Sequence, residues 1–342
     1  MQKPLLEQAQ KKQGRKEGGK MKETNEQPSP PPTTFAERKC LFLNKYKSVN
    51  GHTKYRRYIG SPLRYAGGKS LAVGLIVDLL PDDTKKIVSP FVGGGAVEIA
   101  CSTDLGLPVM AYDIFDLLIN YWDAQIHHPN ELYKRLLQME PTRAEFKRIK
   151  EVLKLVWDGK KKIRSKYDLA ALYYFNHNTS YGPHFLGWPS DIYLQPERYK
   201  KMIEKVRDFK NTNMEVGCAS FEKIMDKHKQ DFLYCDPPYY LNGDSKTFVG
   251  MYPHRNFPVH HINFKHEALR DFLLEHEGGF ILSYNDCSAI REWYKDFDMI
   301  APKWQYTFGQ GDTRLGENRL NGDGSYIKKS HELIIWKKPS RR

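Results

Sequence analysis

The 342-residue sequence is poor in cysteine, and its five cysteines are scattered along the chain. They form no Cys-x-x-Cys pair and no Cys/His cluster, so the sequence predicts neither a disulfide framework nor a zinc site. The chain also lacks an apolar run long enough to cross a bilayer, and its start shows no signal-peptide pattern. We therefore expect a cytoplasmic protein that uses no metal and no membrane.

The positive charge of the chain is unevenly distributed. Residues 1–57 hold 14 Lys or Arg against 5 Asp or Glu, whereas the remaining residues hold 40 against 36. Residues 1–34 are rich in polar residues, Gly and Pro, and such a composition buries too little surface to offset the entropy of ordering. We predict that residues 1–57 form a disordered basic arm. The arm suits nucleic acid, and a simple solvated extension fits it equally well.

Strand-like and helix-like patterns alternate after residue 58. Strands are predicted over residues 85–91 and 107–113, and each is followed by a helical pattern. A strand, a glycine turn, a helix and a strand that ends in an acid begin a doubly wound α/β sheet. Four further segments have strand character: Met214–Cys218, Asp231–Cys235, Gly278–Tyr284 and Ser330–Lys338.

Residues 127–212 interrupt this alternation, because their apolar spacing is mostly helical. We therefore predict one catalytic α/β domain made of residues 58–126 and 213–342, with residues 127–212 as a helical insertion. Residues 157–168 of the insertion are rich in Lys and Arg. This loop suits contact with DNA phosphates, although a solvated charge run is an equal interpretation.

A glycine-rich turn follows the first predicted strand, within the segment SPFVGGGAVEIA. Phe91 precedes the turn, and the glycines from Gly93 to Gly95 let the backbone bend sharply and approach a ligand. Asp113 ends the next strand about 20 residues later, where α/β nucleotide-binding folds place an acid for ribose hydroxyls. The spacing is not that of the dinucleotide motif, so a purely structural turn stays open.

The segment LRYAGGKS ends on the tripeptide GKS, as a Walker A phosphate loop does. That motif requires glycine where this chain has Leu63, and here the segment precedes the first strand instead of following one. A nucleotide triphosphatase is therefore not expected. Tyr65 and Lys69 place an aromatic ring and a cation beside a Gly-Gly turn, which suits a small zwitterionic ligand. A surface turn with a solvated lysine is the alternative.

The segment DFLYCDPPYY ends a predicted strand on a carboxylate and a rigid turn. Asp236 lies at the carboxyl end of the strand, where ligands bind in open α/β sheets. Pro237 and Pro238 have no N–H and cannot continue the sheet, which leaves nearby oxygens as free acceptors. Tyr239 adds a ring face for stacking. Acceptors and a ring together suit the exocyclic amine of a base, and a purely structural turn is the alternative.

In this order, the segments RYAGGK, PFVGGG, AYD and DPPYY resemble the motifs of the Dam-type family of DNA adenine N6-methyltransferases. The resemblance covers residues 60–338 and implies a Rossmann-like methyltransferase sheet with a helical target-recognition insertion that binds double-stranded DNA. Two features depart from the family. Tyr65 stands where Trp is frequent, and residues 240–264 hold more His and Pro than the family pattern.

The resemblance also implies S-adenosylmethionine as the methyl donor and assigns roles to particular residues. The cofactor-binding residues would be Tyr65, Lys69, Phe91, Gly93, Gly95, Asp113 and Asp236. The catalytic groups would be Asp236, Pro237 and Tyr239. The Asp236 carboxylate and the Pro237 carbonyl would accept the amino protons of a flipped-out adenine, and Tyr239 would stack on its ring. Transfer would be direct, without a covalent enzyme intermediate or a metal.

Three functions stay open from the sequence: site-specific adenine N6 methylation, cytosine N4 methylation and non-catalytic DNA binding. Cytosine enzymes more often carry Ser in place of Asp236, and a non-catalytic protein would be expected to have lost Asp236, Lys69 or the glycines. We therefore expect an adenine methyltransferase that acts as a monomer, in a DNA-methylation or restriction–modification system that can include a companion restriction endonuclease. Further candidate DNA contacts are Asn176–His184, Arg314 and Arg319.

Overall fold

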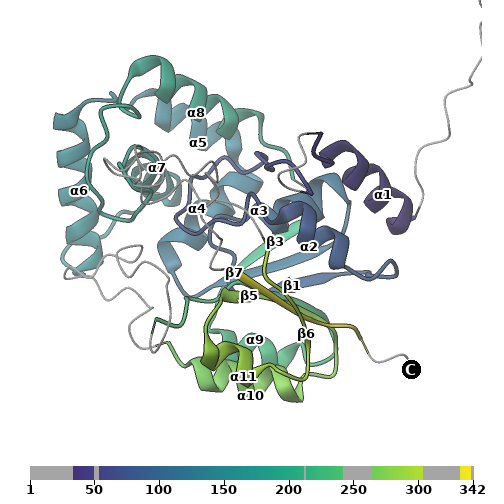
Figure 1. Cartoon of the computed structure of the whole chain (residues 1–342). Helices are drawn as coiled ribbons and strands as arrows, with labels where there is room; N and C mark the ends of the chain where they lie inside the picture. Colours follow the sequence, from purple (N-terminus) through teal and green to yellow (C-terminus); the bar gives the residue numbers. More distant parts are fainter. Residues whose placement is uncertain (1–33, 50–53, 212, 242–263, 303–331, 340–342) are drawn as a thin grey trace, which may run out of the picture. The chain divides into compact units, whose positions relative to one another are not determined.

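The computed structural model describes residues 34–49, 54–211, 213–241, 264–302 and 332–339 (Figure 1). Within them, seven strands form one sheet in the order β3-β2-β1-β4-β5-β7-β6. The strands are β1 (Ile87–Ser89), β2 (Val109–Asp113), β3 (Met214–Cys218), β4 (Phe232–Cys235), β5 (Phe280–Asn285), β6 (Asp298–Ile300) and β7 (Glu332–Lys337). Strands β1 to β5 are parallel, and β7 is antiparallel to both β5 and β6.

Helices cover both faces of this sheet, as Figure 1 shows. The first face carries α1 (Phe35–Tyr46), α2 (Val73–Leu79), α3 (Ala96–Ile99), the π-helical turn η1 (Ala100–Asp104) and α4 (Asp116–His127). The inserted helices α5 (Pro129–Leu137), α6 (Arg143–Trp157), α7 (Lys166–Asn178) and α8 (Pro196–Asp208) belong to the same apolar cluster. The second face carries α9 (Phe221–Lys227), α10 (His266–Glu275) and α11 (Ser288–Trp293).

Side chains of the central strands alternate between these two layers. Ile87 and Tyr234 pack with the helices of the first face, whereas Val88 and Cys235 pack with those of the second. Successive side chains of a strand point to opposite faces, so a strand covered on both sides must be apolar throughout. This arrangement confirms the predicted α/β, Rossmann-like sheet.

The strand order determines where a ligand can bind. From β1 the chain continues outward to β2 and β3, and it later resumes on the other side of β1 with β4 and β5. Connections that diverge in this way leave a crevice at the carboxyl ends of the strands. The glycine turn after β1, Asp113 at the end of β2 and Asp236 after β4 all lie at this edge.

Helices α5, α6 and α8 of the insertion are amphipathic, as the apolar spacing predicts, whereas α7 is buried from Ala170 to Asn178. Helix α6 lies in the predicted helical stretch 127–212, and its N-terminus is capped by Thr142, whose hydroxyl accepts from the Glu145 N–H at 3.1 Å. Helix α7 is capped by Ser165 and continues to Asn178. Because α7 packs against both α4 and α5, it joins the insertion to the sheet layer.

The prediction of a disordered arm is wrong for Phe35–Tyr46, which form α1. Thr34 and Glu37 make a reciprocal capping box at its start, and Phe42 is buried in the core of the first face. The Arg38 Nε donates to the Leu105 carbonyl at 2.7 Å. The burial of α1 offsets the entropy lost on ordering, and the composition of the arm did not predict that burial.

Residues 1–33 lie outside the described residues, and so do most of segment 240–264 and the candidates Arg314 and Arg319. In the part that is described, no helix is both long and apolar enough to span a membrane.

Candidate active site

A cavity of about 640 Å³ opens at the carboxyl edge of the sheet. It is lined by residues from the turns after β1, β2 and β4, by the segment before α2 and by the insertion. All of the residues predicted to bind cofactor or to act in catalysis line it: Tyr65, Lys69, Phe91, Gly93, Gly95, Asp113, Asp236, Pro237 and Tyr239. The tertiary structure therefore brings together four motifs that are separated by up to 174 positions in the sequence.

The glycine turn is shaped by its backbone and by close neighbours. Gly93 and Gly95 have φ angles of +44° and +65°, which favour glycine. A Cβ atom on Gly94 would lie 2.5 Å from the Cβ of Tyr65, so only glycine lets the Tyr65 ring lie against the turn. The Trp122 Nε1 donates to the Gly93 carbonyl at 2.9 Å and anchors the turn to α4.

The Asp113 carboxylate is held in position by backbone donors at the end of β2. Its Oδ2 accepts from the Gly93 N–H at 3.2 Å, and its Oδ1 accepts from the Phe115 N–H at 3.0 Å. Phe91 packs its ring 5.7 Å from that of Phe221 on α9. Asp113 and Phe91 thus give the cavity wall one polar and one apolar group, each held by its neighbours.

A buried lysine on the cavity wall connects Asp236, which lines the cavity, with Glu332, which is buried behind it. The Lys69 Nζ lies 2.6 Å from Asp236 Oδ1 and 3.5 Å from Glu332 Oε1, and it donates to the Gly67 carbonyl at 2.9 Å. The Tyr239 hydroxyl donates to the same Oε1 of Glu332, and the Lys69 ammonium lies 5.0 Å from the Tyr239 ring centroid. Lys69 is therefore no solvated surface cation, because it joins the DPPY turn to β7.

The electrostatic field around Asp236 is shaped by burial and by its charged neighbours. Burial raises the pKa of Asp236 to about 6, the Lys69 ammonium opposes this rise, and the negative charge of Glu332 adds to it. Burial likewise raises the pKa of Glu98 to about 8, although the Ser89 hydroxyl donates to Glu98 Oε1 at 2.6 Å. At neutral pH Asp236 is therefore mostly ionised, whereas Glu98 is mostly protonated and adds a polar group with little negative charge.

Glu332 and Glu98 are site residues that sequence reasoning missed. Each is almost fully buried, with 1% and 2% of its surface exposed, and each interrupts an apolar run, ELIIW and AVEIA respectively. A charged residue within a run that must be buried was the available signal, because such a side chain needs a polar partner inside the protein.

Tyr240, which the sequence left without a role, anchors the DPPY turn from behind. Its carbonyl accepts from the Asn285 Nδ2 at 2.7 Å, at the end of the neighbouring strand β5. Its ring packs edge to face against His266 and Trp293, with centroids 5.2 and 5.1 Å away. These contacts of Tyr240 therefore help to fix the position of the DPPY turn and of Tyr239 within it.

The prediction that the run from Asn176 to His184 reads bases is wrong for its first half, because Asn176 to Ser180 are buried. The Asn178 Oδ1 accepts from the Arg64 N–H at 3.0 Å, and its Nδ2 donates to the Pro62 carbonyl at 3.2 Å. These polar side chains satisfy the backbone of the segment before α2, so the insertion is attached to the cofactor side of the cavity.

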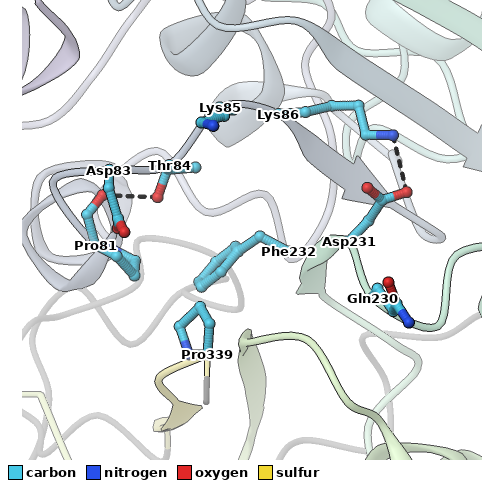
Figure 2. Close-up of a pocket in the computed structure, with 9 residues that line it drawn as sticks. All are labelled: Pro81, Asp83, Thr84, Lys85, Lys86, Gln230, Asp231, Phe232 and Pro339. Atoms are coloured by element: carbon cyan, nitrogen blue, oxygen red, sulfur yellow. Dashed lines mark hydrogen bonds and ion pairs between the residues drawn. The ribbon is translucent and has the colours of Figure 1, made fainter. Parts of the chain in front are cut away.

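The opposite edge of the sheet has a second, smaller cavity of about 200 Å³ (Figure 2). It lies near the amino ends of β1 and β4, and the Lys86 Nζ there forms an ion pair with Asp231 at 2.8 Å. Thr84 donates its hydroxyl to the Pro81 carbonyl at 2.7 Å. These side chains are paired with each other, and none of the predicted site residues lies in this cavity.

The glycine turn, the acid after β2 and the carboxylate after β4 define a nucleotide-cofactor enzyme of the Rossmann-like methyltransferase class. Residues 65–308 match the model of the D12 class N6 adenine-specific DNA methyltransferases, and the chain belongs to that family. This membership confirms the resemblance seen in the sequence, and it argues against cytosine as the target base.

Two relatives are Type II methyltransferases. M.FokI from Planomicrobium okeanokoites is 25% identical over 299 residues, which are 81% of this chain but 44% of that protein, so the chain spans less than half of its length. M1.LlaDCHI from Lactococcus lactis subsp. cremoris is 24% identical over 271 residues, which are 74% of this chain and 91% of the relative.

Within the described residues, no three His, Cys, Asp or Glu side chains are arranged to hold a metal ion.

Proposed function

We propose that this protein transfers a methyl group from S-adenosylmethionine to the exocyclic N6 of a flipped-out adenine in duplex DNA, at a specific site. One observation carries the proposal: a single cavity joins the glycine turn and Asp113 to the Asp236-Pro237-Pro238-Tyr239 turn. A nucleoside cofactor and a base amine can therefore occupy one continuous space.

The lining residues fit S-adenosylmethionine. Asp113 offers an immobilised carboxylate to ribose hydroxyls, and the glycine turn leaves room where any side chain would meet Tyr65. When bound, the cofactor supplies an electrophilic methyl group on a sulfonium centre. The negative charge around Asp236 favours a cation at that end of the cavity.

The DPPY turn can activate an amino group by accepting its protons. Pro237 and Pro238 cannot pair with a strand, and the cavity leaves the Asp236 side chain 20% exposed. Asp236 and the Pro237 carbonyl accept the two amino protons, which localises the nitrogen lone pair otherwise delocalised into the ring. Tyr239 presents its ring to the base. Positioning and electrostatics then carry the transfer.

Lys69 and the target amine compete for the same carboxylate. In this structure the Lys69 ammonium forms an ion pair with Asp236, and Glu332 is a second acceptor 3.5 Å from the Lys69 Nζ. When the base amine binds Asp236, Glu332 can keep the buried ammonium paired. This second partner matters because an unpaired buried charge is strongly destabilising.

The insertion offers a surface for DNA. Tyr181 and Trp188 are 66% and 69% exposed, and the Tyr181 N–H donates to the Trp188 carbonyl at 2.8 Å, so both rings lie on one hairpin. The Lys150 Nζ lies 4.8 Å from the Trp188 ring centroid. Exposed rings stack on bases and cations neutralise phosphates, which offsets the few kcal/mol needed to flip a base.

The names of the two relatives favour a role in a restriction–modification system. In such a system, adenine methylation by this protein would protect the recognition site from a companion restriction endonuclease.

The test compares three versions of the protein in a host that lacks DNA methylation. Sequencing of host DNA for N6-methyladenine should show modification at one recurring sequence with the unaltered protein. Asp236→Ala should abolish it, with a loss of at least ~100-fold in rate, as expected when a group that stabilises the reacting centre is removed. Asp226→Ala, an exposed change on α9, is the matched control. Unmodified DNA from cells that contain soluble, cofactor-binding protein would refute the proposal.

A further inference from the structure

Glu98 is a buried carboxyl of the cofactor cavity that the mechanism above does not use. It lies on α3, directly after the glycine turn, and it is 2% exposed and lines the cavity. Its Oε1 accepts from the Ser89 hydroxyl at 2.6 Å, and no cation in the described part of the chain forms an ion pair with it. A carboxyl that is removed from water without a cationic partner favours its protonated form.

The charged neighbours of Glu98 act in opposite directions. The Lys69 ammonium favours ionisation of Glu98, whereas the negative charge of Asp236 disfavours it. Because the Lys69 Nζ lies 2.6 Å from Asp236 Oδ1, this lysine is already paired with another carboxylate. Cys101 on η1 and Tyr234 on β4 also interact with the charge of Glu98, and both are uncharged at neutral pH because burial raises the pKa of each.

These influences leave Glu98 close to the point at which it ionises. Burial is the main cause that raises the pKa of Glu98 to about 8, while the Ser89 hydroxyl and the backbone N–H of Glu98 itself lower it. Glu98 is therefore mostly protonated at neutral pH. One further positive charge nearby is enough to remove the proton, because such a charge favours the carboxylate form.

S-adenosylmethionine carries such a charge on its sulfonium. Direct transfer requires the methyl group to lie between the sulfur and the amine nitrogen, and reacting atoms about 3–3.5 Å apart place the sulfur within about 5 Å of that nitrogen. The amine is bound to Asp236, so the sulfonium belongs at the end of the cavity where Glu98 interacts with Asp236 and Lys69. After the transfer, the same sulfur is an uncharged thioether.

We propose that Glu98 distinguishes the methyl donor from the spent cofactor, because arrival of the sulfonium drives the proton of Glu98 into solvent and the resulting carboxylate stabilises the sulfonium. This inference rests on the proposed function. S-adenosylhomocysteine has the same ammonium and carboxylate groups but no sulfonium, so it leaves Glu98 protonated. The cavity therefore favours the donor, and exchange of product for a new donor is coupled to release of a proton.

The size of the coupling follows from simple electrostatics. A unit positive charge about 6 Å away, at an effective dielectric constant of about 20, lowers the pKa of a carboxyl by about 2. At neutral pH this change releases roughly 0.8 proton from Glu98 for each S-adenosylmethionine bound, and it strengthens binding about tenfold relative to a neutral group at the same position.

Calorimetric titration of the full chain at neutral pH, in two buffers with different ionisation enthalpies, counts the protons released on binding. The unaltered protein should release roughly 0.8 proton more with S-adenosylmethionine than with S-adenosylhomocysteine. Glu98→Gln has the same shape and can still accept from the Ser89 hydroxyl. It should remove most of this difference and weaken S-adenosylmethionine binding on the order of tenfold, with unchanged affinity for S-adenosylhomocysteine.

Two further variants make the result specific. Ser89→Ala keeps the carboxyl of Glu98 but removes its donor, so the proton release should move to higher pH. Glu275→Gln, an exposed change at the end of α10, should behave as the unaltered protein. Equal proton release with both ligands, or undiminished release in Glu98→Gln, would overturn the inference. Failure of the unaltered protein to bind S-adenosylmethionine would instead refute the proposed function, so the two failures are distinguishable.

Discussion

Replacement of Glu332 by Gln should lower the pKa of Asp236 and move the acidic limb of the methylation rate to lower pH. Asp236 must be ionised to accept the amino protons, so the rate rises as pH increases through its pKa of about 6. The negative charge of Glu332 raises that pKa. Gln has the same shape, and its carbonyl oxygen can still accept from the Tyr239 hydroxyl.

The size of the effect follows from the shared lysine. Both carboxylates contact the Lys69 Nζ, at 2.6 and 3.5 Å, so the two contacting oxygens are at most roughly 6 Å apart. Two like charges at this distance repel by ~3 kcal/mol at an effective dielectric constant of about 20, and by ~0.7 kcal/mol in bulk water. Because ~1.4 kcal/mol corresponds to a tenfold change in an acid dissociation constant, we expect the pKa of Asp236 to fall by about 1.

Single-turnover methylation rates, measured between about pH 5 and about pH 8 at saturating cofactor, give the midpoint of the acidic limb directly. Glu275→Gln, an exposed change at the end of α10, is the control for general loss of negative charge. A midpoint that stays in place, or that moves to higher pH, would show that Glu332 does not set the charge state of Asp236.

Two other substitutions test the site. Glu98→Gln should stabilise the protein at pH 8 and above. Because the pKa of Glu98 in the folded protein is raised to about 8, its carboxyl group favours folding only while it is protonated, and this stability is lost as the pH rises through 8. The gain should be roughly 4–5 kcal/mol and should vanish near pH 4, and thermal unfolding at several pH values measures it. Gly94→Ala should displace Tyr65, because the new Cβ would lie 2.5 Å from that of Tyr65. Cofactor affinity should fall on the order of tenfold, and a variant that binds normally would exclude close approach of Tyr65 to the turn.

The strands and most helices follow from local patterns. Segments such as FLYC and FILSYN are apolar throughout, because both of their faces are covered. Helix α6 was predictable to its ends from apolar spacing and a Thr cap. Helix α1 was not, because its stability comes from burial against residues distant in the sequence, and composition does not report that burial.

The candidate site divides in the same way. Some site residues can be recognised from a few neighbouring positions. A glycine turn and paired prolines restrict the backbone, and an acid after a strand requires a polar partner. Asp113, Asp236 and the glycine turn were therefore accessible from the sequence. For Glu332 the apolar run ELIIW signals only that the charge is buried, and its partners could not be predicted because Lys69 and Tyr239 lie 263 and 93 positions away along the chain.

The sequence by itself determined the class of this protein, through ordered motifs that each place a known kind of group at a strand end. Only the tertiary structure decided the charge pattern of the cavity. Lys69 is paired with Asp236 and Glu332 because side chains from distant segments are buried together. Burial strengthens every charge interaction and penalises every missing hydrogen bond, and neither effect can be read from neighbours in the chain.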